Sequence, residues 1–66
     1  MIIDLSAYMK AGYTPIMGCR KDVALAYVQR HYGGDAAELR NERIIVDGIP
    51  TEYYWEYDNL FKKGGQ

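Results

Sequence analysis

The chain has 66 residues and a formal net charge of −1, with 48% apolar and 26% charged residues. These values are typical of one small folded domain and exclude a disordered chain. The single cysteine excludes an internal disulfide, and no apolar run reaches the ~18 residues of a membrane span. The N-terminus carries no secretory signal pattern, so we expect a cytoplasmic protein that does not enter a membrane.

The first expected element is a short helix over residues 4–11. Asp4 or Ser6 can cap its start, and Gly12 follows where a helix readily ends. A strand over residues 1–5 is the competing interpretation.

Residues 13–18 allow two interpretations. Thr14 followed by Pro15 is a good start for a helical turn, because proline suits the first helical position. The segment Tyr13–Met17 can equally form a short extended piece at a sheet edge, with Gly18 ending it.

The clearest helix is expected over residues 19–32, where Val23–Val28 contains no helix breaker and Gly33-Gly34 marks the end. The helical period places Ala24, Tyr27, Val28 and His31 on one face. Leu25 and Tyr32 lie beside this face. We expect the helix to cover the sheet with it.

A further short helical turn is expected after the glycine pair. Asp35 and Glu38 have the spacing of a capping box, and the turn extends through Arg40. The resulting order of helix, extended piece, helix, short helix and hairpin is the element order of a winged-helix domain.

A β-hairpin is expected near the C-terminus, with strands over residues 42–46 and 49–57. Asp47-Gly48 between two β-rich runs is the strongest short-range hairpin signal. The predicted fold class is therefore α+β. Two or three short helices, the main one over residues 19–32, pack on this C-terminal antiparallel hairpin, and a short N-terminal strand is an optional addition.

A two-residue turn also determines the register of the hairpin, in which Val46 faces Ile49 and Arg43 faces Glu52 as a favourable cross-strand pair. Alternation along the strands assigns to the core face Ile44, Val46, Ile49, Thr51, Tyr53, Trp55 and Tyr57. The outer face carries Arg43, Ile45, Pro50, Glu52, Tyr54 and Glu56. Because proline lacks an N–H for another partner strand, we expect a sheet edge at Pro50.

The globular domain is expected to span residues 1–61. Leu60-Phe61 supply a last apolar anchor, and the few residues between Tyr57 and Gly64 leave no clear room for another strand. Residues 62–66 are therefore expected to form a flexible tail.

No catalytic or metal-binding pattern stands out. A lone Cys19 and a lone His31 do not supply the about four ligands of a zinc site, and no third group orients them as nucleophile and base. The carboxylates of Glu52, Glu56 and Asp58 share the outer face, whereas a general acid needs burial to raise its pKa. We therefore expect a protein that is not an enzyme and uses no metal or other cofactor.

The hairpin end of the chain is acidic and rich in tyrosine. Residues 42–61 carry five acidic groups and one basic group, whereas residues 1–41 carry four acidic and five basic groups. Tyrosine and tryptophan dominate the binding hot spots of protein interfaces. The candidate partner-binding residues are Glu52, Tyr54, Glu56, Tyr57 and Asp58.

These features favour a small protein-binding module that occludes a partner protein, or a homodimer formed through the strand that carries Pro50 and Tyr54. Very small domains without catalytic motifs are common among bacteriophage and mobile-element proteins. We expect a role of that kind, as an inhibitor of a host protein or a small virion or assembly component. A winged-helix DNA-binding regulator is the alternative, but its acidic hairpin would repel the nucleic-acid backbone.

Overall fold

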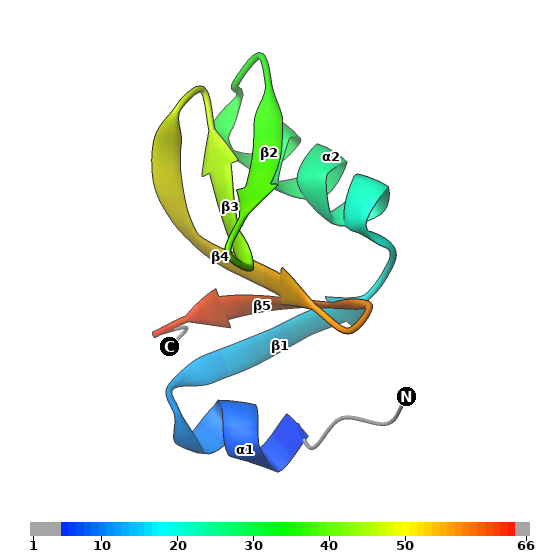
Figure 1. The fold of residues 1–66 in the computed structure, drawn as a ribbon, viewed down its shortest axis with the longest axis vertical. Helices are drawn as coiled ribbons and strands as arrows, with labels where there is room; N and C mark the ends of the chain where they lie inside the picture. Colours follow the sequence, from blue (N-terminus) through cyan, green and yellow to red (C-terminus); the bar gives the residue numbers. More distant parts are fainter. Residues whose placement is uncertain (1–4, 65–66) are drawn as a thin grey trace.

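The computed structural model describes residues 5–64. Two helices and five strands follow one another in this part of the chain (Figure 1): α1 (Leu5–Lys10), β1 (Tyr13–Gly18), α2 (Lys21–Tyr32), β2 (Ala37–Arg40), β3 (Arg43–Val46), β4 (Ile49–Glu56) and β5 (Asn59–Lys63). The strands form one antiparallel sheet in the order β1-β5-β4-β3-β2. The α+β class is confirmed, and residues 13–18 take the extended form. The predicted hairpin is matched in part, because β3 and β4 pair but lie inside a five-stranded sheet with β5 after them.

The two helices cover different parts of a strongly twisted sheet. In Figure 1, β2 and β3 run across the direction of β1 and β5, and the long strand β4 bends from one pair to the other. α2 packs against β2, β3 and β4, whereas α1 packs against β1. The strand that competed with the first helix falls on residues 1–4, outside the described part of the chain, and on Leu5, which belongs to α1.

The core lies between α2 and the sheet. Ala24 and Val28 of α2 are fully buried and pack in one cluster with the buried strand residues Ile44, Val46, Tyr53 and Leu60. Tyr27 and His31, which the helical period places on the same face, stay exposed. Because Ala24 and Val28 are small, the helix approaches the sheet closely, and its rings of Tyr27 and His31 lie beside the buried Tyr53.

Three two-residue turns connect β2 to β5. Their central residues are Asn41-Glu42, Asp47-Gly48 and Tyr57-Asp58, and all six have positive φ. This is the pattern of type I′ turns, whose twist matches that of the flanking strands. Only Asp47-Gly48 has a sequence that predicts such a turn. Asp47 is the one residue with a Cβ atom that this turn places in the left-handed region, whereas each of the other two turns places two such residues there, at a cost of roughly 1–2 kcal/mol per residue.

The β3–β4 hairpin begins in the predicted register and then departs from it. Val46 pairs with Ile49 as expected. Arg43, however, pairs with Tyr54, and the prediction that it faces Glu52 is wrong.

A bulge in β4 causes the change of register. At this point the Thr51 hydroxyl donates a hydrogen bond to the Ile44 carbonyl at 2.7 Å and accepts one from the Tyr53 N–H at 3.1 Å. A buried side chain thus satisfies two backbone groups that a regular ladder would pair with each other.

Most of the predicted core face of the hairpin is correct. Four of its residues are buried, namely Ile44, Val46, Thr51 and Tyr53. Trp55 packs against the core and donates its Nε1–H to the Cys19 carbonyl at 2.8 Å. The assignment is wrong for Ile49 and Tyr57, which are exposed because each lies at a turn, beyond the part of the sheet that α2 covers.

β4 is a sheet edge only in its first half. Its pairing with β5 begins at Tyr53, so residues 49–52 have β3 on one side alone, as expected at Pro50. Tyr54 pairs with both Arg43 and Phe61. A homodimer that added a strand to β4 could therefore use only the first half.

The segment after the glycine pair is a strand, and the expected helical turn through Arg40 is wrong. The Asp47 carboxylate accepts the N–H groups of Asp35 and Ala36, each at 3.0 Å, and the Asp47 N–H donates to the Ala36 carbonyl at 2.9 Å. These bonds tie the segment to the hairpin and direct β2 along β3. The winged-helix element order thereby loses its third helix.

β5 is a strand that the sequence analysis does not predict. It lies between β1 and β4, and it includes Lys62 and Lys63, which the sequence analysis assigned to the tail. Leu60 and Phe61 are both fully buried. Leu60 joins the core under α2, and Phe61 packs against α1 on the opposite face.

Candidate functional site

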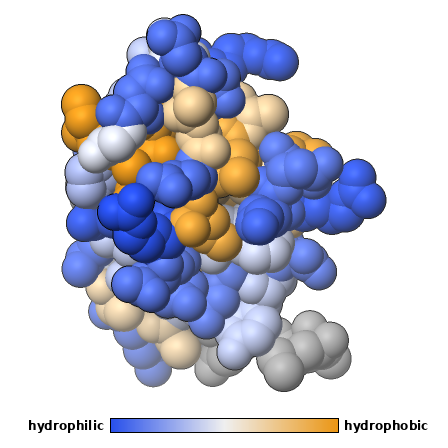
Figure 2. Space-filling view, turned by 45° about the horizontal axis from the view of Figure 1, so that its top comes forward, coloured by the Kyte–Doolittle hydropathy of each residue, from blue (hydrophilic) through white to orange (hydrophobic). Residues whose placement is uncertain are grey.

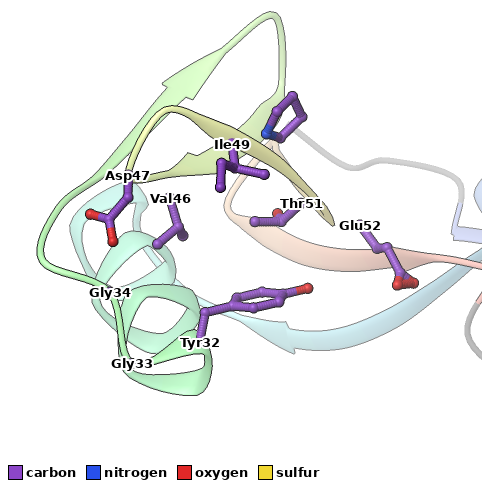
Figure 3. A pocket seen from close by; sticks show the side chains of 9 residues that line it. Tyr32, Gly33, Gly34, Val46, Asp47, Ile49, Thr51 and Glu52 are labelled. Atoms are coloured by element: carbon purple, nitrogen blue, oxygen red, sulfur yellow. The ribbon is translucent and has the colours of Figure 1, made fainter.

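A groove opens between the C-terminal end of α2 and the β3–β4 hairpin (Figure 3). Its volume is about 400 Å³. Nine residues line it: Tyr32, Gly33, Gly34, Val46, Asp47, Ile49, Pro50, Thr51 and Glu52. Two elements that are distant in the sequence therefore form one concave surface.

Tyr32 and Ile49 are the exposed apolar walls of the groove. Ile49 is 68% exposed and Tyr32 is 47% exposed. Edge contacts with His31 and Tyr53 hold the Tyr32 ring, at centroid distances of 5.1 and 6.1 Å. In Figure 3 this ring extends from the end of α2 beneath Ile49 and Thr51 toward Glu52. Figure 2, which brings this end of the molecule forward, shows hydrophobic side chains exposed among hydrophilic ones.

Gly34 sets the width of the groove. A Cβ atom at this position would lie 2.3 Å from Val46 Cγ1 and 2.8 Å from Asp47 Oδ2. A larger residue would therefore push the end of α2 away from the hairpin. The glycine pair ends the helix, as predicted, and its second member also permits this close approach.

The groove is acidic. Of the residues that line it, Asp47 and Glu52 are acidic and none is basic. The Asp47 carboxylate already accepts two backbone N–H groups. Glu52 is exposed, and its side chain makes no hydrogen bond or ion pair with any residue that the structure describes. A free carboxylate beside apolar walls favours a ligand that carries positive charge.

The structure divides the five predicted partner-binding residues among three places. Glu52 lies in the groove. Tyr54 and Glu56 line a second pocket, on the face of the sheet opposite to α2. Tyr57 and Asp58 form the exposed β4–β5 turn. These residues are close in sequence, but the bulge and the turn separate them in space.

The second pocket lies between α1, β4 and the β2–β3 turn and has a volume of about 220 Å³. Seven residues line it: Tyr8, Tyr13, Asn41, Glu42, Tyr54, Glu56 and Phe61. Tyr8 stacks on Phe61 with 4.4 Å between ring centroids, and its hydroxyl donates to the Glu56 carboxylate. Tyr13 meets Tyr54 edge to face at 5.1 Å.

The Tyr8 hydroxyl has a raised pKa. The hydrogen bond to Glu56 is the largest cause, and burial and the charges of Glu56, Tyr57 and Glu42 add to it. Together they raise the pKa of Tyr8 from 10.0 to about 12. The hydroxyl therefore keeps its proton and acts as a donor at neutral pH.

The described residues contain no grouping that fits a metal or a nucleophile. No cluster of three or more His, Cys, Asp or Glu side chains in residues 5–64 could hold a metal ion. Cys19 precedes α2 and His31 lies in its last turn, so the helix separates them. Burial raises the pKa of the Cys19 thiol, with the charges of Asp22 and Asp58 adding to it, and this disfavours the reactive thiolate. In the same part of the chain, no helix is long and apolar enough to span a membrane.

Sequence reasoning missed several residues of both sites. The sequence could have indicated that Tyr32 and Ile49 are exposed. Tyr32 precedes the glycine pair and Ile49 follows the Asp-Gly turn, and side chains at such positions extend past the core. Tyr8 and Tyr13 had none, since their role depends on where α1 and β1 lie on the sheet.

Comparison of the chain with protein-family models, with curated proteins and with solved structures gives no match. Its function is therefore inferred from its own residues.

Proposed function

We propose that the protein is a non-enzymatic protein-binding module. Its groove takes an apolar side chain that lies next to a lysine or arginine in an extended segment of a partner protein. One observation carries the proposal: Tyr32 and Ile49 are large, apolar and exposed on the two sides of one groove. Exposed apolar patches with a polar rim mark sites of protein interaction.

The two walls and the rim have different tasks in this proposal. Burial of an exposed apolar side chain contributes about 1.5–3 kcal/mol, so Ile49 and Tyr32 supply the affinity. Glu52, which has no cation of its own among the described residues, supplies the preference for a basic neighbour.

The first half of β4 suits an extended segment of the partner. Residues 49–52 have a strand on one side only. Because Pro50 has no N–H to donate to an added strand, the partner is selected by the fit of its side chains in the groove and not by backbone pairing. A module that covers a partner's surface in this way would act by occlusion, as expected for an inhibitor or a small assembly component.

Selection of random displayed peptides on the purified protein tests the proposal. We expect the selected peptides to share an apolar residue adjacent to lysine or arginine. Ile49→Ser should abolish their binding, and Glu52→Lys should remove the preference for basic neighbours. Ile16→Ser is the matched control, because Ile16 is also an exposed strand isoleucine but lies in β1.

Two outcomes would overturn the proposal. One is a set of bound peptides whose affinity is unchanged by Ile49→Ser and Glu52→Lys. The other is a concentration-dependent dimer that Ile49→Ser converts to a monomer in sedimentation experiments, which would make a second copy of the chain the occupant.

A further inference from the structure

We propose that the second pocket, lined by Tyr8, Tyr13, Tyr54, Glu42 and Glu56 among others, binds an alkylammonium group. This site lies on the face of the sheet opposite to α2 and shares no residue with the groove. Aromatic rings attract organic cations through the negative charge of their faces, and carboxylates at the rim strengthen this attraction.

The rings of this face already attract cations of the chain itself. The Arg43 guanidinium lies 5.1 Å from the centre of the Tyr54 ring, and the Lys63 ammonium lies 5.5 Å from that of Tyr13. The Arg43 Nε atom is buried and has no hydrogen-bond partner in the described structure. Tyr13 and Tyr54 stand nearly perpendicular to each other, at 87°.

The carboxylates at this pocket are not neutralised. The ion pairs among the described residues join Arg20 to Asp22 and Arg40 to Glu38, and neither involves Glu42 or Glu56. Both glutamates lie close enough to the Tyr8 hydroxyl to raise its pKa, so their charges converge on the same region. An anion would be repelled there, whereas a cation would complete the site.

The size of the pocket selects the kind of cation. Its volume of about 220 Å³ is below the roughly 300–1,000 Å³ of pockets that hold drug-sized ligands. The end of a lysine side chain, methylated or not, and a free quaternary ammonium compound both have the required chemistry.

Titration of the labelled protein with choline, followed by NMR, tests the proposal. We expect saturable shifts at residues that line the pocket, and none from the uncharged isostere in which carbon replaces the nitrogen. A lysine peptide and its trimethylated form then identify the source. Tighter binding of either peptide than of choline indicates a protein ligand, and the reverse order indicates a free small molecule.

Removal of the two carboxylate charges at the pocket is a second test of the proposal. The double variant Glu42→Gln/Glu56→Gln keeps an oxygen that can accept the Tyr8 hydroxyl, and we expect choline to bind on the order of tenfold more weakly. Glu38→Gln is the matched control and should leave choline binding unchanged, because Glu38 lies in β2, pairs with Arg40 and lines neither the groove nor the second pocket.

Equal responses to choline and its isostere, or unchanged affinity in the double variant, would overturn the proposal. Neither result bears on the groove, whose tests use Ile49 and Glu52.

Discussion

The two faces of the sheet are packed in different ways. Under α2 the fully buried residues are aliphatic, namely Ala24, Val28, Ile44 and Leu60. Rings of α2, those of Tyr27, His31 and Tyr32, contact the Tyr53 ring beside this aliphatic centre. Under α1 the contacts join aromatic rings, such as Tyr8 on Phe61, and hydroxyl and carboxylate groups lie at their margins. On the first face the centre is filled by side chains and the groove lies at the end of α2, whereas on the second face the pocket lies among the rings themselves.

This difference shows how a very small domain can combine stability with recognition. A chain of 66 residues can build only a modest core. Aliphatic side chains exclude water but offer a ligand no polar group. Aromatic rings also bury a large area, and they present charged faces and hydroxyls as well. The α2 face should therefore carry most of the stability, and the α1 face should tolerate polar changes.

The largest expected effect is on the α2 face. Leu60→Ala removes a fully buried side chain and should lower the free energy of unfolding by about 2–5 kcal/mol, measured by urea denaturation. Val23→Ala, at an exposed position on the outside of α2, should change it by less than about 0.5 kcal/mol. Similar losses in the two variants would contradict the placement of the core.

Thr51→Val should have the next largest effect, because Thr51 is the buried polar residue on the α2 face. The change leaves the Ile44 carbonyl and the Tyr53 N–H without their partner. Because these two groups can shift toward pairing with each other, we expect a total loss of about 1–3 kcal/mol in the free energy of unfolding. Thr51→Ser keeps the hydroxyl and should retain most of the stability, and a loss as large as that of valine would show that the methyl group matters instead.

Gly34→Ala tests the contact between α2 and the hairpin. Because its Cβ atom would lie 2.3 Å from Val46 Cγ1, we expect a loss of about 1–3 kcal/mol from overpacking and a wider groove. At Gly33 φ is 68°, so alanine there is strained, but its added Cβ atom would have no contact within 4 Å. Gly33→Ala should therefore lower stability without separating α2 from the hairpin, whereas Gly34→Ala should lower stability and also change peptide binding at the groove.

Tyr8→Phe should have the smallest effect, because it removes only a hydroxyl on the α1 face. We expect a loss of about 0.5–1.5 kcal/mol at neutral pH, measured by urea denaturation. A loss as large as that of Leu60→Ala would show that the α1 face contributes as much to stability as the α2 face.

The same hydroxyl predicts a pH dependence. The pKa of Tyr8 is about 12 in the folded protein against 10.0 for an ordinary tyrosine, so folding favours the protonated form. Its contribution to stability is complete below pH 10 and is lost as the pH rises from 10 to about 12. The difference in stability between wild type and Tyr8→Phe should shrink over this interval. Absorbance titration of the variant should show one tyrosine fewer among those that ionise above pH 10.

Short sequence motifs correctly predicted the turns and helix ends that depend only on residues adjacent in the sequence. Gly33-Gly34 ends α2, and Asp47-Gly48 forms the β3–β4 turn. The spacing of Asp35 and Glu38 is also a local signal, but it failed because a side chain from the hairpin binds the same backbone groups. β5 was missed because Tyr57-Asp58 is an uncommon sequence for its turn.

The candidate sites were predictable only in part, for a related reason. Composition indicated an acidic, tyrosine-rich hairpin, and Glu52, Tyr54 and Glu56 do line pockets. A single strand face cannot reveal that a bulge separates them. Nor can it show that Tyr8, from the other end of the chain, lies over Phe61.

The pairing of β1 with β5 has a consequence for the order of folding. Strands β2 to β5 are joined by two-residue turns, whereas Tyr13 pairs with Lys63, about 50 residues away. Local hairpins close early and distant pairs late, so we expect β1 and α1 to dock last and to open first in hydrogen exchange. The second pocket takes Tyr8 and Tyr13 from this late segment and Glu56 from the early one. A cation bound there would contact both segments and so stabilise the docking of α1 and β1 against β4.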